Sequence, residues 1–279
     1  MASYLAVTLD PLHIGAGGYR LGRVDNTIVR DAGSGLPKVP GSSLAGVIRC
    51  YAGWCLEEDE KDTAKKKEEE FFGVAADGKD KKNSHIGLLR FYDGHIVAFP
   101  VRTMSGPVWV TCPSVLAMHD IKAPSFPNEE TLLVYFDPMT PKGEDPHLNL
   151  GWLYMPCKRV EGSIGLSLGE AASLFSRFVI APDWLFSEIV NSNLEVRTSV
   201  SINSETGAAE TGALFTYEAI PSATLLSFDI EIDTYRCKDT DTVTYIRKIL
   251  QRSMRMCASF GLGGMNTRGF GRVRFLEDK

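Results

Sequence analysis

Glycine and proline divide this chain so often that long helices can form in only a few places. The sequence has 26 Gly and 14 Pro among 279 residues. Many of these glycines fall in three loops, GAGG at 15–18, GSGLPKVPG at 33–41 and GLGGMNTRGFG at 261–271. Proline breaks a helix interior and glycine weakens it, so the regular structure must lie between these loops.

Two of the intervening segments have the apolar period of an amphipathic helix. The first has Leu44, Val47, Ile48, Tyr51, Trp54 and Cys55, and we expect Ser42 or Ser43 to cap it. It leads into residues 57–70, with eight acids and four bases, which we interpret as a solvated helical extension or a loop. The second is expected to run from a cap at Asp241 through Ser259. Two short helices are expected over residues 171–178 and 183–193.

The remaining segments are rich in β-forming residues. We expect strands over residues 3–9, 108–116, 223–233 and 273–276, and an irregular insertion over residues 117–165. Asp93-Gly94 between two β-rich runs predicts a hairpin, and residues 195–218 predict a second one. The order of strand, helix, hairpin, insertion, strand, helix and strand favours an α+β fold with a ferredoxin-like or RRM-like core.

The charge of the chain excludes an indiscriminate basic coat but not a local nucleic-acid site. The formal net charge is −5, yet residues 236–276 hold nine bases against two acids and residues 20–49 hold five against two. A ligand responds to the charge within about 10 Å. The start lacks a signal peptide and no window is apolar enough to span a membrane, so we expect a cytoplasmic protein. The six scattered cysteines include no C-x-x-C pair and are expected to be reduced.

Glycine-rich loops with nearby arginines favour a phosphate-backbone ligand, because glycine lets backbone amides approach an anion. None of the three loops matches a Walker A or dinucleotide-binding motif, and the chain has no serine or cysteine triad context. Asp25 lies close in sequence to basic residues, where a carboxylate could hold a cation or orient a nucleophile, although the local sequence alone favours a solvated loop aspartate. From the residues alone, His13 is interpreted as a packed histidine and Glu218 as a surface acid.

Several motifs together resemble the RAMP superfamily of type III CRISPR effector complexes. They are PLHIGAGG, GRVDNTIVRD, GLPKVPGSSLAGVIR, AFPVRT, VWVTCPSVL and GLGGMNTRGFGRVRF. The segments WVTCPSVL and EVRTSVSINSETGAAETGALFTYEAIP are most similar to the repeated backbone subunit of the type III-B (Cmr) complex. Ala45 stands where the family often has lysine, which leaves one guide contact either missing or supplied by Arg49.

The resemblance implies a single RAMP domain over residues 1–279. Its RRM-like palm would span about residues 1–116 and 222–279, its insertion 117–192 and its protruding thumb hairpin 193–221. Asp25 matches the family's cleavage aspartate and would bind a divalent metal ion, Mg²⁺ or Mn²⁺. His13 and Glu218 match positions near the scissile phosphate. The expected RNA-binding residues are Gly17, Gly18, Arg20, Arg23, Ser42, Ser43, Arg49, Arg197, Thr198, Gly263, Gly264, Asn266, Arg268 and Arg272.

The function that the resemblance implies is metal-dependent cleavage of target RNA at regular intervals. The expected partners are a CRISPR RNA guide, the single-stranded target RNA, further copies of the chain in a helical filament and other Cmr subunits. Two alternatives remain open. One is a non-catalytic RNA-binding scaffold, as in type III-A complexes or an inactive paralogue. The other is a metal-free nuclease that processes CRISPR RNA through a histidine.

Overall fold

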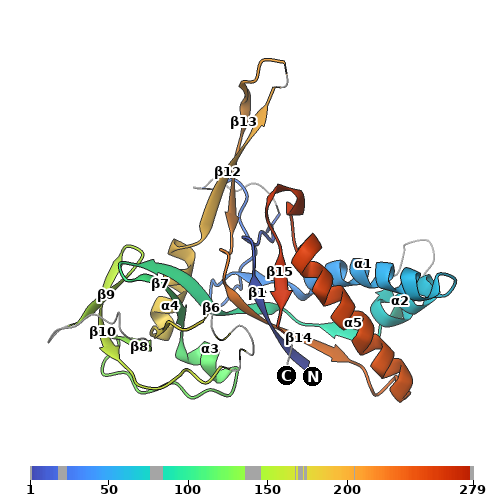
Figure 1. The fold of residues 1–279 in the computed structure, drawn as a ribbon, viewed down its shortest axis with the longest axis horizontal. Helices are drawn as coiled ribbons and strands as arrows, with labels where there is room; N and C mark the ends of the chain where they lie inside the picture. The colour runs from blue at the N-terminus through green and yellow to red at the C-terminus, as the bar shows by residue number, and fades with distance from the viewer. Residues whose placement is uncertain are drawn as a thin grey trace.

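The structure, a computed structural model, is a mixed α/β fold with a large mixed sheet, which confirms the predicted mixture of helices and strands. It describes residues 2–17, 24–75, 84–135, 146–166, 168, 172, 175–203 and 205–276, without the side chains of 211–213. Figure 1 shows two lobes and a hairpin that projects from between them. The helices are α1 (Gly41–Glu60), α2 (Ala64–Phe72), α3 (Pro113–Ala117), α4 (Asp183–Ser192) and α5 (Thr240–Phe260).

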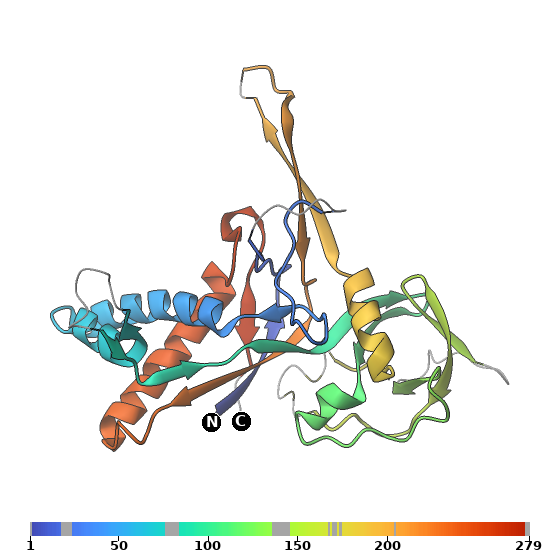
Figure 2. The ribbon, with the colours of Figure 1, turned by 180° about the vertical axis from the view of Figure 1, so that it is seen from behind.

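The main sheet passes through both lobes. In spatial order its strands are β15 (Val273–Phe275), β1 (Ala2–Thr8), β14 (Leu225–Ile232), β6 (Gly94–Thr103), β7 (Gly106–Thr111), β11 (Phe178–Ile180), β8 (Leu132–Tyr135), β10 (Leu153–Arg159) and β9 (His147–Leu150). Beside this path, β2 (Lys38–Val39) pairs with β6 and β5 (Leu89–Phe91) pairs with β14. The first part of β6 pairs with β14 and its second part with β7, so β6 joins the lobes (Figure 2).

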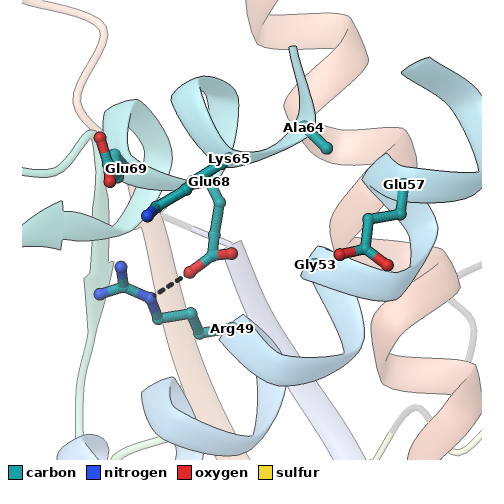
Figure 3. A pocket seen from close by; sticks show the side chains of 7 residues that line it. All are labelled: Arg49, Gly53, Glu57, Ala64, Lys65, Glu68 and Glu69. Atoms are coloured by element: carbon teal, nitrogen blue, oxygen red, sulfur yellow. Dashed lines mark hydrogen bonds and ion pairs between the residues drawn. The ribbon is translucent and has the colours of Figure 1, made fainter. Parts of the chain in front are cut away.

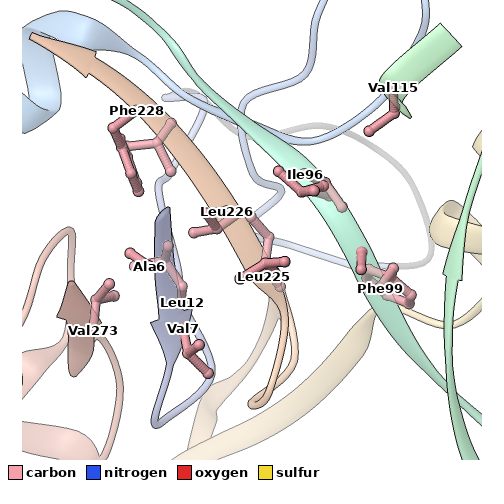
Figure 4. Packing of buried hydrophobic residues seen from close by; sticks show 14 of the residues in the cluster. Ala6, Val7, Leu12, Ile96, Phe99, Val115, Leu225, Leu226, Phe228 and Val273 are labelled. Atoms are coloured by element: carbon pink, nitrogen blue, oxygen red, sulfur yellow. The ribbon is translucent and has the colours of Figure 1, made fainter. Parts of the chain in front are cut away.

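The hydrophobic core follows from the alternation of the strands and the period of the two long helices. Figure 4 shows apolar side chains of β1, β14 and β6 packed together, among them Leu226, Phe228 and Phe99, each at most 1% exposed. Helices α1 and α5 pack against each other beside this part of the sheet. Both helices bury most of the apolar positions predicted for them, although Trp54 is 46% exposed.

The predicted hairpin at Asp93-Gly94 is wrong. Strands β5 and β6 do not pair with each other, because both pair with β14, one after the other along the same edge. Gly94 is required because a Cβ there would collide with the ring of Phe228. The Asp-Gly pair therefore separates two strands that follow each other along the same edge of β14. The Asp93 side chain binds the start of α1.

Both predicted helix caps are also wrong. Helix α1 begins at Gly41 after Pro40, with no cap from its serines, and the Asp93 carboxylate accepts from the Gly41 amide at 2.8 Å. An acid distant in sequence thus takes the place of the local serine. In α5 the capping side chain is Asp239, which accepts from the Thr242 amide at 3.0 Å.

The insertion is more regular than the sequence indicates. Strands β8, β9 and β10 lie within residues 117–165, and they extend the main sheet instead of forming an irregular segment. Alternation is weak in these short strands, and Pro156 in β10 obscures it further. The helix expected over residues 171–178 is wrong where the structure describes it, because residues 175–177 are not helical and Phe178 begins β11. Positions 171, 173 and 174 lie outside the described residues. Helix α4 confirms the predicted helix after Pro182.

The charged run at residues 57–70 is mostly helical and takes part in ion pairs. It forms the end of α1 and most of α2. Arg252 of α5 contacts Asp59 at 2.7 Å and Glu58 at 2.6 Å. Lys67 contacts Glu60 at 2.8 Å. The run therefore neutralises part of the basic charge of α5 as well as facing solvent.

Replacing Asp93 with alanine is expected to lower the free energy of unfolding by about 1 kcal/mol, the typical worth of an N-cap side chain. Asp93 binds both Lys38 and the Gly41 amide, and these contacts hold the pKa of its carboxyl below the usual value. The contribution is therefore present above about pH 4 and is lost as the pH falls through the lowered pKa. Urea denaturation of Asp93→Ala and Ser42→Ala at several pH values tests this. A greater loss at Ser42 would contradict the assigned cap.

Candidate functional site

The site is built around the base of a projecting hairpin. Strands β12 (Glu195–Ile202) and β13 (Ala209–Ala219) pair antiparallel from Glu195 opposite Ala219 to Val200 opposite Leu214. The hairpin points away from both lobes (Figure 1). One of its faces exposes apolar side chains, those of Val196, Val200 and Leu214. An exposed apolar face on an otherwise polar ribbon is typical of a surface that receives a partner.

The loop that contains Asp25 forms a third strand-like layer beside the base of β13. Asn26 makes a parallel bridge to Tyr217. Its amide donates to the Thr216 carbonyl, and its carbonyl accepts from the Glu218 amide, both at 3.0 Å. These backbone contacts fix the position of the loop relative to the hairpin.

Asp25 is a partly exposed carboxylate with a defined orientation. Its Oδ2 atom accepts from both the backbone amide and the hydroxyl of Thr216, each at 2.8 Å. The Thr216 backbone bond first, and then its hydroxyl bond, lower the pKa of Asp25 below the usual value for an aspartate, so the group is ionised at neutral pH. No other residue in the described part of the chain donates to Oδ1. Thr216 therefore holds the ionised Asp25 carboxylate by Oδ2 and leaves Oδ1 for a ligand.

Glu218 is buried and paired rather than lying on the surface. It is 8% exposed, its Oε1 accepts from Arg30 Nη2 at 2.6 Å, and its Oε2 accepts from the Ile28 amide at 3.2 Å. Arg30 also donates to the Asn191 side chain of α4 at 3.0 Å. The interpretation of Glu218 as a plain surface acid is wrong, because the residue ties the Asp25 loop to β13.

His13 contacts the base of the hairpin at Glu218 and Tyr217 of β13. Its Nδ1 is 2.6 Å from the Glu218 carbonyl oxygen, which only accepts, so Nδ1 carries a proton. Its ring meets Tyr217 edge to face at 5.7 Å. The His13 carbonyl accepts from the Gly264 amide at 2.9 Å. Gly263 has φ +83 and no room for a Cβ, which would lie 2.6 Å from that carbonyl. The C-terminal glycine loop is therefore docked on the first one.

Two arginines predicted to bind RNA make contacts with other groups of the protein, although both side chains stay partly exposed. Arg272 makes a two-pronged contact with Asp10 at 2.6 and 3.0 Å, which lowers the pKa of Asp10 and raises that of Arg272. Arg197 donates to Glu195 at 2.6 Å and to the Gly269 carbonyl at 3.2 Å, and it lies over the Phe270 ring. Arg272 thus connects the C-terminal segment to Asp10, just after β1, and Arg197 connects the hairpin to the C-terminal glycine loop. Since Arg252 and Arg236 also pair with acids, the basic excess of residues 236–276 is smaller than the count predicts.

The residues predicted at the start of α1 form a separate group. Ser42 is exposed and Ser43 is half-buried in the first turn. Ser42 and Arg49 line a shallow pocket of about 370 Å³ with Phe72 and Arg90. Figure 3 shows Arg49 turned toward α2, where it donates to Glu68 at 2.7 Å; it also donates to the Gly73 carbonyl. Its predicted role in binding RNA stays a prediction.

Other predicted residues lie at the surface or outside the described part of the chain. Gly17, Thr198, Asn266 and Arg268 are exposed. Thr198 lies directly opposite Thr216 on the hairpin, which places it on the face above Asp25. Gly18, Arg20 and Arg23 fall outside the described residues.

A divalent ion would find one carboxylate here and not a complete cage of protein ligands. Within the described residues, no group of three or more His, Cys, Asp or Glu side chains lies close enough to hold a metal. Magnesium commonly binds one or two carboxylates together with substrate phosphates and water. Asp25, whose residue is partly exposed and whose Oδ2 alone is bound by Thr216, is the side chain that would hold such an ion.

Sequence reasoning missed Thr216, Arg30 and Tyr217, which position the three predicted catalytic residues. Thr216 is 191 positions from Asp25, and Arg30 is 188 positions from Glu218. Nothing in the local sequence around Asp25 indicates these partners. The register of β12 and β13, together with the bridge at Asn26, is needed to find them.

The sequence matches the RAMP superfamily over residues 6–274. The chain belongs to the RAMP superfamily. This RAMP-superfamily protein is 30% identical to the CRISPR system Cmr endoribonuclease Cmr4 of Pyrococcus furiosus. The alignment covers 99% of this chain and 97% of the relative. The resemblance found in the sequence is thereby confirmed.

Solved structures show the same fold. A chain of the type III-B Cmr-beta complex bound to cognate target RNA matches with a TM-score of 0.72 and 19% identity, covering 98% of this chain and 95% of that one. Oligomeric Cmr4 from Pyrococcus furiosus matches with a TM-score of 0.66 and 21% identity, over 100% and 99% of the two chains. In the described part of this RAMP-superfamily chain, no helix has the length and apolar character of a membrane span.

Proposed function

We propose that this protein is a guide-binding backbone subunit of a type III-B CRISPR complex that cleaves target RNA. The observation that carries the proposal is the ionised Asp25, held at the base of a projecting hairpin between two glycine-rich loops. The match over nearly the full chain to a relative named an endoribonuclease supports it. Among the described residues no basic side chain pairs with Asp25, and such a carboxylate is suited to act on a ligand that brings its own charge.

The fold supplies the parts that this function needs. We assign the RRM-like palm to β15, β1, β14 and β6, the neighbouring strands of the main sheet, with α1 and α5 packed beside them. The hairpin of β12 and β13 is the thumb, and its exposed apolar face displaces nucleotides of the guide–target duplex. Further copies stack along the guide, which lies on the glycine loops and the start of α1. Recognition of the guide runs through its backbone, while base pairing selects the target, as in another class of RNA-guided effector.

Asp25 lies where the RNA backbone is distorted. A displaced nucleotide turns the backbone so that a 2′-hydroxyl lines up with the neighbouring phosphorus. The Asp25 carboxylate orients that hydroxyl through its exposed Oδ1, while Thr216 holds Oδ2. Asp25 would hold a divalent ion, which when bound would supply stabilisation of the charge that develops on the phosphate oxygens. His13 and Glu218 support the position of the Asp25 loop, because His13 binds the Glu218 carbonyl and Glu218 binds the Ile28 amide.

The experiment is a cleavage assay on the assembled complex, purified from cells that express the chain with its sibling subunits. The preparation is expected to contain a discrete small RNA. Added complementary RNA is expected to be cut at regular intervals in Mg²⁺ and to stay intact in EDTA. Target that binds but remains full length in Mg²⁺ would support the scaffold alternative. Repeat RNA cut in EDTA by the isolated chain would support the processing nuclease. Either result would overturn the proposal.

A further inference from the structure

Thr216 contacts Asp25 through both its backbone amide and its side-chain hydroxyl. Its amide and hydroxyl both donate to Oδ2 at 2.8 Å. The Asp25 amide lies 2.9 Å from the same hydroxyl oxygen and donates to it. The hydroxyl therefore both receives a hydrogen bond from the main chain of Asp25 and gives one to its side chain, which fixes both in one arrangement.

This contact joins the hairpin to the reactive loop. Thr216 belongs to β13, and its carbonyl accepts from the Asn26 amide. Two residues further on, Glu218 binds the Ile28 amide and Arg30. The loop from Asp25 to Arg30 is therefore attached to β13 at several points along its length. The hydroxyl of Thr216 is the side-chain part of this attachment, and it acts on the carboxylate together with the Thr216 amide.

We propose that Thr216 is the positioning residue for Asp25, and that it aims Oδ1 at the RNA by occupying Oδ2. The inference rests on the proposed function, in which Asp25 acts in target cleavage. It assigns a role in that step to a hairpin residue, so the element that displaces a nucleotide also orients the carboxylate beside it. A carboxylate without this contact rotates about its side-chain torsions, and misplacement on the scale of 1 Å costs up to about 100-fold in rate.

The test compares Thr216→Val with Thr216→Ser in the assembled complex. Valine keeps the shape and the backbone amide but removes the hydroxyl, whereas serine retains the hydroxyl. Single-turnover cleavage by Thr216→Val is expected to be about 10- to 100-fold slower, with unchanged affinity for target RNA. Thr216→Ser is expected to cleave close to the wild-type rate. Equal rates for valine and wild type would overturn the proposal, and so would failure of serine to restore the rate.

A second readout does not depend on cleavage. In Thr216→Val the Asp25 amide loses its acceptor, so hydrogen exchange in the peptide containing Asp25 is expected to become faster in the full complex without target. Thr216→Ser is expected to retain the wild-type protection. Exchange that is unchanged in Thr216→Val would contradict the observed contact.

Thr242 provides a matched control. Its amide and hydroxyl both donate to Asp239 Oδ2, at 3.0 and 2.5 Å, in the same arrangement but at the start of α5. Thr242→Val therefore loses a comparable hydrogen bond and is expected to leave cleavage unchanged. Equal slowing by both valine variants would show a general loss of stability and overturn the proposal.

The test also separates this inference from the proposed function. If Asp25→Asn abolishes cleavage while Thr216→Val does not, Asp25 keeps its role and the positioning role of Thr216 is wrong. If Asp25→Asn cleaves normally, the proposed function itself fails.

Discussion

Replacing Glu218 with leucine is expected to lower the free energy of unfolding by about 2–4 kcal/mol. The change leaves Arg30 without its carboxylate partner and the Ile28 amide without its acceptor. Breaking a largely buried pair from one side is costly because the remaining charge stays desolvated. Glu218→Gln keeps an oxygen for Ile28 and is expected to lose less. Urea denaturation of the full-length chain measures both changes.

An exposed ion pair is the appropriate control for that measurement. Glu60 contacts Lys67 at 2.8 Å, but its side chain is 51% exposed. Glu60→Leu is therefore expected to change the free energy of unfolding by only about 0–1 kcal/mol. If Glu218→Leu cost no more than Glu60→Leu, the structural role given to the Arg30–Glu218 pair would be wrong.

Replacing Asp25 with asparagine in the assembled complex is expected to slow target cleavage by about 10²–10⁴-fold, the usual contribution of a positioned acid–base group. Asparagine retains an oxygen that accepts from Thr216, so the loop keeps its place while the negative charge is lost. Target binding is expected to be unchanged, because base pairing and backbone contacts provide it. Rates from single-turnover cleavage and affinities from filter binding separate the two effects.

Asp31 offers a matched control in the same connecting segment. Its Oδ1 accepts from the amides of Gly33 and Ser34 at 3.0 and 2.9 Å, so it is a structural turn aspartate. Asp31→Asn removes the same charge close by in sequence and is expected to cleave at the wild-type rate. A similar loss in both variants would point to the overall charge of the loop and not to the Asp25 carboxylate.

Much of the fold could be predicted because its largest elements carry strong periodic patterns. The apolar stripes of α1 and α5 indicated both helices correctly, and β1, β14 and β15 lie where β-rich runs were found. The errors at Asp93-Gly94 and at the start of α1 share one physical cause. The local signals of Asp93-Gly94 and of the serines in the first turn of α1 were overruled by contacts between distant segments, since Asp93 caps α1 and β14 pairs with both β5 and β6.

The same limit applies to the candidate site. Asp25 and His13 were singled out from their own segments and from the resemblance. Their partners Thr216 and Glu218 come together with them only through the register of the hairpin and its bridge to Asn26. Charge counting overestimated the free basic surface because it does not show that Arg272 pairs with Asp10 or that Arg252 pairs with Asp59. Pairing across the fold, and not composition, decides which charges remain for a ligand.

The most direct test of target cleavage by this subunit is the product pattern of an end-labelled complementary RNA. The wild-type complex and the Asp25→Asn complex are loaded with the same guide, incubated with the RNA in Mg²⁺, and their products are resolved to single nucleotides. The proposed function predicts evenly spaced products from the wild type and intact, bound RNA from the variant. The same evenly spaced products from both complexes would contradict the account.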